Sequence, residues 1–300
     1  MGDGQEYFPP CAVQDSRMEI ITSPEEMTAW ANRHFRAGKK IALVPTMGFF
    51  HDGHLSLMHR ARELADRVAV SLFVNPIQFA PGEDLSRYPR DFERDGRLAG
   101  EAGVDLLFCP EASVMYPSGA STRVVVSGLT EGLCGRSRPG HFAGVTTVVA
   151  KLFNLVKPQV AVFGEKDFQQ LAVIRRMVAD LNWDISIVAH PIVRERDGLA
   201  MSSRNSYLSP EERQSALCLY RAIQHARKRV REGLFNASLM REELLAMLTE
   251  DGKVEVDYVS FVDGQSLALQ ETLQEGTVLA MAVKVGRTRL IDNDSIMAGD

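Results

Sequence analysis

The sequence has little excess charge of either sign, and it has no long apolar run. Its formal net charge is −5 over 300 residues, which argues against a broad basic surface for nucleic acid but leaves room for a local phosphate pocket. No apolar stretch approaches the roughly 18 residues that cross a bilayer. The start of the chain lacks the basic and apolar regions of a secretory signal. We therefore expect a cytoplasmic protein without nucleic-acid or membrane partners.

Cysteines are few and scattered. Cys11, Cys109, Cys134 and Cys218 form no C-x-x-C pair, so neither a zinc site nor a disulfide framework is indicated. We expect no metal site built from protein side chains. Internal repeats and low-complexity tracts are also lacking, and 45% of the residues are apolar, as in an average globular protein. The length suggests about two domains.

From Met18 onward, apolar runs alternate with segments of helical periodicity. The candidate helices are 55–66, 145–156 and 168–182, and this alternation predicts a doubly wound α/β sheet. In such sheets, ligands bind beyond the carboxyl ends of the strands. Several candidate strands are rich in valine and isoleucine, as parallel strands buried on both faces are. The candidate strands are 41–45, 68–74, 104–108, 122–128, 160–163 and 185–193.

The pattern changes near residue 209. The sequence SPEE (209–212) is a capping box with proline at the first helical position, which predicts a helix to about Arg231. A second helix is expected over 237–250. Strands are expected after it, over 254–263 and over 277–285, the latter leading into 288–293.

Helices followed by strands, without alternation, suggest a smaller α+β domain at the C-terminal end. We therefore expect a first domain over 18–198 and a second domain over 199–300. Residues 1–17, which contain Pro9-Pro10, are expected to be a flexible extension.

Two histidines lie where a candidate strand is followed by a helix, in PTMGFFHDGH (45–54). A helix N-terminus carries unsatisfied N–H groups and partial positive charge, so it attracts phosphate. His51 and His54 are three residues apart and point the same way, so both can donate to phosphate oxygens. Gly53 permits a ligand to approach the backbone closely. The alternative is an ordinary turn with two surface histidines.

A second polar segment, VFGEKDFQQL (162–171), also follows a strand. Lys166 offers a positive charge, and Asp167 could cap the next helix. Gln169 or Gln170, in the first turn of that helix, could bond a hydroxy acid. The alternative is a surface loop with a Lys-Asp pair.

The third segment, LAMSSRNSYLS (199–209), lies at the expected domain boundary. Ser202, Ser203 and Arg204 offer hydroxyls and a bidentate guanidinium, which suit phosphate. The alternative is a polar linker, and a hinge and a phosphate clamp are compatible roles.

Further polar residues are less decisive. Asn75 and Gln78, in VNPIQF (74–79), are neutral amides that could bind a substrate. The glycine-rich loop 135–144 is either a lid over an anion or a flexible surface; it carries Arg136, Arg138 and His141. Four acidic residues are expected to be solvated charges unless one holds a metal-bound water: Glu83, Asp84, Asp91 and Asp95.

Six motifs together carry a resemblance: PTMGFFHDGH, VNPIQF, RYPR, RPGHFAGV, GEKDFQQL and DGLAMSSRNSYLS. In this order they resemble the pantoate–β-alanine ligase family, within the HxGH nucleotidyltransferase superfamily, over about 18–293. The resemblance implies a homodimer with a Rossmann-like domain and a smaller C-terminal α+β lid domain. It also implies that Mg-ATP activates pantoate as pantoyl adenylate and that β-alanine then releases AMP, giving pantothenate and, from the first step, pyrophosphate.

The resemblance also implies residue roles. Gln78 would hold pantoate and face β-alanine, Gln170 would bind pantoate, and Asn75 is our further candidate for substrate contact. His54 would be the proton donor. Electrostatic catalysis would come from His51, His54, Lys166, Ser202, Ser203 and Arg204. The ATP-binding residues would be Met47, Gly48, Phe49, Phe50, His51, Asp52, Gly53, His54, Gly164, Glu165, Lys166, Asp167, Val193, Met201, Ser202, Ser203 and Arg204.

One local departure separates this chain from the family pattern. Phe49-Phe50 stands where the family usually has Ala-Leu, so the shape of the substrate pocket is open. Two other functions also stay open at this stage. One is a nucleotidyltransferase that stops after the first step, and the other is a nucleotide-binding module without catalysis.

Overall fold

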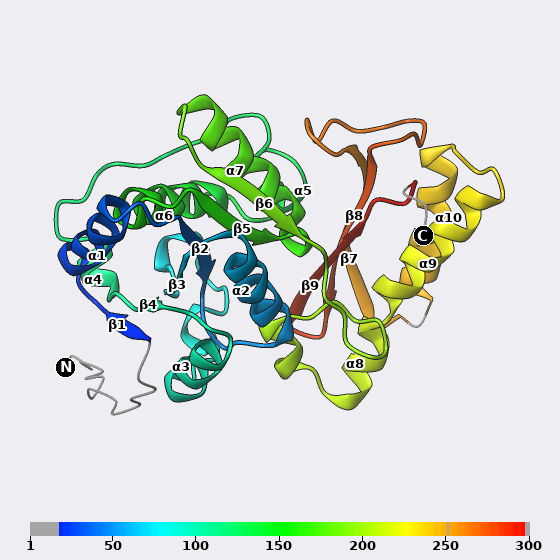
Figure 1. The fold of residues 1–300 in the computed structure, drawn as a ribbon. Helices are drawn as coiled ribbons and strands as arrows, with labels where there is room; N and C mark the ends of the chain where they lie inside the picture. The colour runs from blue at the N-terminus through cyan, green and yellow to red at the C-terminus, as the bar shows by residue number, and fades with distance from the viewer. Residues whose placement is uncertain (1–17, 251, 298–300) are drawn as a thin grey trace.

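The computed structural model describes residues 18–250 and 252–297. The extension expected over 1–17 lies outside these residues. Figure 1 shows a larger part built around a parallel sheet and a smaller part in which an antiparallel sheet packs beside helices. No helix of the described segments is long and apolar enough to span a membrane.

The larger part contains a six-stranded parallel sheet with the order β1-β4-β3-β2-β5-β6. Parallel neighbours need crossover connections, which is why strands and helices alternate along the sequence. The strands are β1 (Glu19–Ile21), β2 (Ile41–Thr46), β3 (Arg67–Leu72), β4 (Leu106–Phe108), β5 (Val160–Gly164) and β6 (Ser186–His190).

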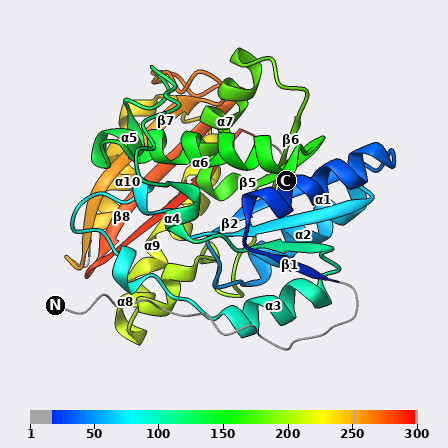
Figure 2. The same ribbon diagram turned by 90° about the vertical axis from the view of Figure 1, so that its left-hand side faces the viewer.

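Helices cover both faces of this sheet (Figure 2). On one face lie α1 (Pro24–Arg36), α6 (His141–Val156) and α7 (Phe168–Asp180), and on the other lie α2 (Asp52–Leu64) and α3 (Phe92–Glu101). Side chains of β2 alternate between the two cores: Ile41 and Leu43 face α1 and α6, whereas Ala42 and Val44 face α2. The doubly wound α/β prediction is therefore confirmed. Two short helices, α4 (Ala112–Met115) and α5 (Leu133–Ser137), complete this part.

The strand order reverses at β2. From β2 the chain moves to β3 and β4 on one side, and after α6 it returns to the other side of β2 as β5. A doubly wound sheet has its binding crevice at such a switch point, beyond the carboxyl ends of the strands. β2 ends at Thr46, just before the HDGH turn, and β5 ends at Gly164, just before Lys166. The topology therefore brings these two sequence motifs together.

The C-terminal part has helices followed by strands, as expected. Its helices are α8 (Pro210–Ala216), α9 (Cys218–Arg231) and α10 (Ala237–Thr249), and its antiparallel sheet has the order β7-β8-β9. The strands are β7 (Val254–Asp263), β8 (Thr277–Val285) and β9 (Thr288–Asp294).

The start of α8 is the predicted capping box. The Ser209 hydroxyl accepts from the Glu212 N–H at 3.2 Å, and the Glu212 carboxylate accepts from the Ser209 N–H at 2.9 Å. A single helix as far as Arg231 was wrong, because Leu217 separates α8 from α9. Leu217, with φ −62° and ψ −12°, is both the C-cap of α8 and the N-cap of α9.

One predicted strand is absent from both sheets of the described chain, and one observed strand was not predicted. Residues 122–128 join neither sheet, because hydroxyls of α6 satisfy this backbone instead. The Val124 N–H donates to Thr147 Oγ1 at 3.0 Å, and the Val124 carbonyl accepts from Thr146 Oγ1 at 2.6 Å. Conversely, β1 was not predicted, since three residues are too short to show a periodic pattern.

Candidate active site

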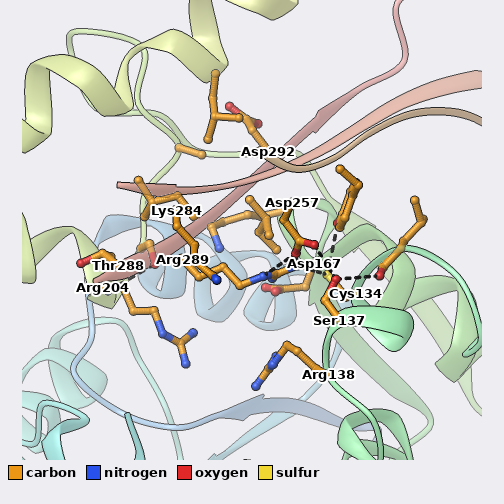
Figure 3. Close-up of a pocket in the computed structure, with 18 of the residues that line it drawn as sticks. Cys134, Ser137, Arg138, Asp167, Arg204, Asp257, Lys284, Thr288, Arg289 and Asp292 are labelled. Carbon is orange, nitrogen blue, oxygen red and sulfur yellow. Dashed lines mark hydrogen bonds and ion pairs between the residues drawn. The ribbon is translucent and has the colours of Figure 1, made fainter. Parts of the chain in front are cut away.

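A cavity of about 230 Å³ lies at the switch point, and a larger one of about 780 Å³ adjoins it. The smaller cavity is lined by the ends of β2 and β5, the start of α2, and residues of the segments 191–193 and 201–204. The larger cavity extends from this site to β7, β8 and β9 (Figure 3). Lys166, Asp167 and Arg204 line both.

The turn between β2 and α2 is held by a buried carboxylate. Asp95, on α3, is 1% exposed and accepts from the N–H of Phe49 at 2.6 Å and from the N–H of Phe50 at 2.7 Å. Gly48 and Phe49 have positive φ angles of 85° and 52°, a conformation that costs a non-glycine residue roughly 1–2 kcal/mol. The Phe50 ring is fully buried in the core, and the Phe49 ring lies 5.5 Å from the Arg94 guanidinium. The two phenylalanines therefore pack away from the cavity.

Both histidines of the HDGH motif are at the start of α2. His51 is the N-cap residue, and its N–H donates to His54 Nδ1 at 3.4 Å. A neutral His54 therefore carries its proton on Nε2, which remains free to donate to a ligand. A Cβ atom at Gly53 would lie 3.0 Å from two atoms of the His51 ring, which explains the glycine of the motif. Within the described part of the chain, His51 Nδ1 is buried without a hydrogen-bond partner.

The electrostatics of the site keep these imidazoles neutral. Burial, followed by the charge of Lys166, lowers the pKa of His51 to about 4. Burial, with the charges of His51 and Lys166, holds the pKa of His54 well below its ordinary value. At neutral pH both rings therefore act as N–H donors rather than as cations.

The GEKD turn is supported from the C-terminal sheet. Residues 165–167 form the 3₁₀ turn η3 (Glu165–Asp167), and Asn293 of β9 donates to the carbonyls of Glu165 at 3.0 Å and of Lys166 at 2.9 Å. Asp167 occupies the N-cap position of α7, but its side chain makes no capping hydrogen bond. The predicted cap was therefore wrong, and the Asp167 carboxylate faces the cavities instead.

The two neighbouring glutamines of α7 have different environments. Gln169 is buried, and its amide bonds backbone groups at the start of α5 and just before it: the Cys134 N–H at 2.9 Å, the Leu129 carbonyl at 2.8 Å and the Gly132 carbonyl at 2.9 Å. Gln170 lines both cavities. Of the two, Gln170 is therefore the one placed to meet a ligand.

Asn75 and Gln78 form a linked pair beside α6. Gln78 ends the 3₁₀ turn η1 (Pro76–Gln78), and its Oε1 accepts from Asn75 Nδ2 at 3.1 Å. Asn75 Nδ2 also donates to the Gly144 carbonyl at 3.1 Å, and Asn75 Oδ1 accepts from the Tyr116 hydroxyl at 2.8 Å. Asn75 is 1% exposed. Protein groups thus engage both ends of its amide, which orients Gln78.

The MSSR segment contacts the HDGH turn and a carboxylate. Ser203 Oγ donates to the Phe49 carbonyl at 3.3 Å, and Ser202 Oγ accepts from the Arg204 N–H at 3.2 Å in the 3₁₀ turn η4 (Ser203–Tyr207). Arg204 donates to both oxygens of Asp84, at 2.8 and 2.9 Å. The Arg204 guanidinium, which lines the cavity, is therefore already paired with the Asp84 carboxylate.

The glycine-rich loop places a second arginine beside the first. Arg138 donates to both oxygens of Glu83, at 2.6 and 2.7 Å, and to His141 Nε2 at 3.1 Å. His141 Nδ1 in turn donates to the Gln78 carbonyl at 2.8 Å, and burial followed by the Arg138 charge lowers the pKa of His141 to about 4. In Figure 3, Arg138 and Arg204 reach the same side of the larger cavity. This segment is therefore bonded to the site rather than a flexible surface.

Most residues expected from the sequence converge here, and five do not line either cavity. Gly48, Phe49, Phe50, Asp52 and Glu165 lie outside the two linings. Those that line the smaller cavity are Met47, His51, Gly53, His54, Asn75, Gln78, Gly164, Lys166, Asp167, Gln170, Val193, Met201, Ser202, Ser203 and Arg204.

The expectation that the acidic residues of 83–95 are solvated was wrong for three of them. Glu83 and Asp84 pair with arginines, and Asp95 is buried. The fourth residue, Asp91, is exposed and caps α3 by accepting from the Arg94 N–H at 3.1 Å. A signal for Asp95 existed, since it shares the buried stripe of α3 with Gly96 and Ala99. A carboxylate on an apolar stripe requires a partner.

Comparison with known proteins gives consistent matches along the chain. The family model described as pantoate–β-alanine ligase matches residues 19–295. The pantothenate synthetases of Heliobacterium modesticaldum and Geobacter sulfurreducens are each 57% identical over 276 residues, which is 92% of this chain and 98% of theirs.

Solved structures agree with these sequence matches. A pantothenate synthetase from Thermus thermophilus has a TM-score of 0.89 and 46% identity, covering 94% of this chain and 100% of that one. A pantoate–β-alanine ligase from Francisella tularensis, complexed with β-γ ATP and β-alanine, has a TM-score of 0.78 and 31% identity, covering 94% of this chain and 99% of that one.

Proposed function

This chain belongs to the pantoate–β-alanine ligase family and makes pantothenate from pantoate, β-alanine and ATP; we propose that it does so through pantoyl adenylate. In the first step, a pantoate carboxylate oxygen attacks the α-phosphorus of ATP, and pyrophosphate leaves. In the second step, the amine of β-alanine attacks the activated carbonyl, an amide bond forms and AMP leaves. One proton is released from the amine.

Charge is the main obstacle in the first step. The attacking carboxylate is already ionised at neutral pH, so little base catalysis is needed, but it approaches a triphosphate that is also anionic. The rate must come from positioning and from donors aimed at the phosphate oxygens. The observation that carries the proposal is the convergence of the HDGH, GEKD and MSSR segments on one cavity.

The proposed residue roles follow from this convergence. Neutral His51 and His54 would donate N–H groups to phosphate oxygens, and Lys166 would add the positive charge. Ser202 and Ser203 would donate from the facing segment, at the mouth where Arg204 is held by Asp84. The remaining lining residues named above, Met47 and Val193 among them, would contact the nucleotide.

The pantoate site would lie deeper in the same cavity. Gln78 and Gln170 would bind its hydroxyls and carboxylate with neutral amides, and Gln78 would also face the incoming β-alanine. Asn75 would act through Gln78, whose Oε1 it holds at 3.1 Å. Gly48, Phe49, Phe50, Asp52 and Glu165 would shape the ATP site through their backbone rather than their side chains.

We propose that ATP enters as its magnesium complex. Within residues 18–250 and 252–297, no group of three or more His, Cys, Asp or Glu side chains is placed to hold a metal ion. This fits Mg²⁺ that is held largely by phosphates and water, as it commonly is in nucleotide sites. Asp167, which directly follows Lys166 and lines both cavities, could hold one of those waters.

The other assignments rest on the family. We propose a homodimer, a cytoplasmic location and two domains, 18–198 and 199–300, with the second acting as a lid. Light scattering of the purified protein tests the dimer, since a monomeric mass would refute it.

Product analysis tests the reaction. With ATP, pantoate and β-alanine together, pantothenate, AMP and pyrophosphate should form in equal amounts. Formation of ADP, or of a stable nucleotidyl product that β-alanine does not consume, would refute the proposal.

A further inference from the structure

Asp95 is a deeply buried carboxylate that lacks a closely bonded counterion among the described residues. Of the described acidic residues, Asp95 and Asp292 are buried, with exposed fractions of 1% and 2%. Asp292 has a conventional counterion, because Arg194 donates to both of its oxygens at 2.7 and 2.9 Å. For Asp95 the nearest recorded cation is Arg94, whose Nη1 lies 4.0 Å away. Two backbone amides bond its oxygens instead. Burial keeps the pKa of Asp95 above its ordinary value, although these two amides lower it.

Those amides belong to the turn that precedes the two histidines. Asp95 Oδ2 accepts from the Phe49 N–H at 2.6 Å, and Oδ1 accepts from the Phe50 N–H at 2.7 Å. Two successive residues with positive φ, Gly48 and Phe49, turn these N–H groups into one concavity, the arrangement that binds anions in proteins. Here the anion is a side chain of the protein itself.

The fit between Asp95 and this turn is close. A Cβ atom at Gly48 would lie 3.0 Å from Asp95 Oδ2, so the carboxylate leaves space only for glycine there. Phe49 has a left-handed φ of 52° although its side chain disfavours that conformation. The hydrogen bond from its N–H to Asp95 favours it. Without the carboxylate, the backbone at 49 would relax toward the ordinary extended or helical region.

Such a relaxation would reach both histidines. Phe50 is followed directly by His51, the N-cap of α2, whose N–H holds His54 Nδ1. The same turn also offers the Phe49 carbonyl to Ser203 Oγ at 3.3 Å. One buried carboxylate thus determines the position of donors from two of the three converging segments.

We propose that Asp95 is a positioning residue for His51 and His54 in the first step of the reaction. The proposal rests on the function proposed above, because the histidines must act on ATP for their position to matter. Asp95 itself contacts no substrate, since it lies behind the turn and outside both cavity linings. It acts through the backbone of residues 48–51.

Asp95→Asn is the decisive variant. Its size is unchanged, but an amide has only one acceptor oxygen, and its NH₂ group would face a backbone N–H. We expect the pantoate-dependent exchange of pyrophosphate into ATP to fall ten-fold or more in kcat. The KM for pantoate should stay within three-fold, because Gln78 and Gln170 lie on other elements.

Asp105→Asn is the matched control. Asp105 also accepts a backbone N–H, from Val68 at 2.8 Å, and it pairs with Arg62 and Arg67. It lies just before β4, at the amino end of the sheet and opposite the site. This variant should lower the thermal midpoint at least as much as Asp95→Asn and should keep its exchange rate within two-fold of the unmodified protein.

A spectroscopic readout separates position from stability. In ¹⁵N spectra of labelled histidine, the unmodified protein should show His54 protonated at Nε2, because Nδ1 accepts from the His51 N–H. Asp95→Asn should give a mixture of tautomers while remaining folded, and Asp105→Asn should not. If Asp95→Asn does not fold, Asp95→Glu keeps the charge but moves the carboxylate, and the same two changes are expected.

The outcomes separate this proposal from the proposed function. Unchanged exchange and an unchanged His54 signal in a folded Asp95 variant would overturn the positioning role. The same would follow if both asparagine variants lost exchange in proportion to their lost stability. Absence of pantoate-dependent exchange in the unmodified protein would instead refute the proposed function, while the His54 signal would still test whether Asp95 sets the turn.

Discussion

At the scale of single residues, the candidate site presents neutral donors held in fixed positions. His54 is oriented by the His51 N–H through Nδ1, which leaves Nε2–H for a ligand. The sequence placed both histidines at a helix start, because the apolar strand before them and the helical periodicity after them were both visible. It could not show which nitrogen donates, since that depends on a bond within the turn.

Replacing His54 tests its share in the chemistry. We expect His54→Ala to lower kcat by on the order of 100- to 1,000-fold, about 3–4 kcal/mol, as is typical for one lost donor to developing charge. His59, exposed on the same helix, provides the control, and His59→Ala should keep full activity. Turnover of His54→Ala within a few-fold of the unmodified protein would show that this ring does not take part.

The buried histidines also predict a dependence of stability on pH. The folded pKa values of His51 and His141 are lowered to about 4, against roughly 6.5 in an unfolded chain. The unfolded state therefore binds more protons below pH 6.5, and the free energy of unfolding should decline as pH falls from about 6.5 to about 4. Each ring contributes about 2–3 kcal/mol over this window.

His141→Gln is the variant to compare over this pH range. Urea unfolding at several pH values should show a shallower decline of the free energy of unfolding, by up to about 1.4 kcal/mol per pH unit. The slope, rather than the absolute stability, is the readout, since the variant also loses the bond to the Gln78 carbonyl. An unchanged slope would mean that His141 is not held neutral in the fold.

At the scale of elements, glycines set how closely α6 approaches the strand ends. A Cβ atom at Gly144 would lie 2.4 Å from the Ile77 carbonyl oxygen, so α6 can contact η1 only through glycine. The contact lets Asn75 bond the Gly144 carbonyl and hold Gln78. The motif RPGHFAGV was recognisable in the sequence, but this approach of backbone to backbone was not.

Gly144→Ala should therefore impair pantoate binding. We expect the KM for pantoate to rise ten-fold or more and the thermal midpoint to fall, because the helix must move away from η1. Gly96, in α3, is the matched helical glycine: an added Cβ there meets nothing within 4 Å. Gly96→Ala should keep the KM and add roughly 0.5–1 kcal/mol of stability. Equal KM values in the two variants would contradict this account of the contact.

The elements themselves were largely predictable, and the failures are instructive. Strands β2, β3 and β5 are buried on both faces, so their continuous apolar runs predicted them correctly. Residues 122–128 have a similar composition but bond to hydroxyls of α6, a partner that no local pattern reveals. Asp95 was misjudged for the same reason, because its partners lie 45 and 46 residues earlier in the chain.

At the scale of the whole molecule, the C-terminal sheet supports the candidate site of the other part. Asn293 of β9 bonds two carbonyls of the GEKD turn, and Arg194 bonds Asp292 next to it. On the other side, Arg289 and Ser137 share Asp257, and Cys134 lies 3.1 Å from the Tyr258 hydroxyl (Figure 3). The position of Lys166 therefore depends on contacts between the two parts.

Asn293→Ala tests this dependence. Losing two hydrogen bonds should cost about 1–3 kcal/mol of stability and raise the KM for ATP several-fold, because the Lys166 turn is less constrained. Ser260→Ala, on β7 of the same sheet, serves as control and should change neither value much. A KM for ATP that is unaffected in Asn293→Ala would show that the turn keeps its position without β9.

In the proposed reaction, ATP activates pantoate before β-alanine takes part. The most direct measurement is the exchange of labelled pyrophosphate into ATP by the unmodified protein, with and without each substrate. Exchange should require pantoate and proceed without β-alanine, since adenylation is complete before the amine arrives. Exchange that ignores pantoate, or that appears only when β-alanine is added, would contradict the account.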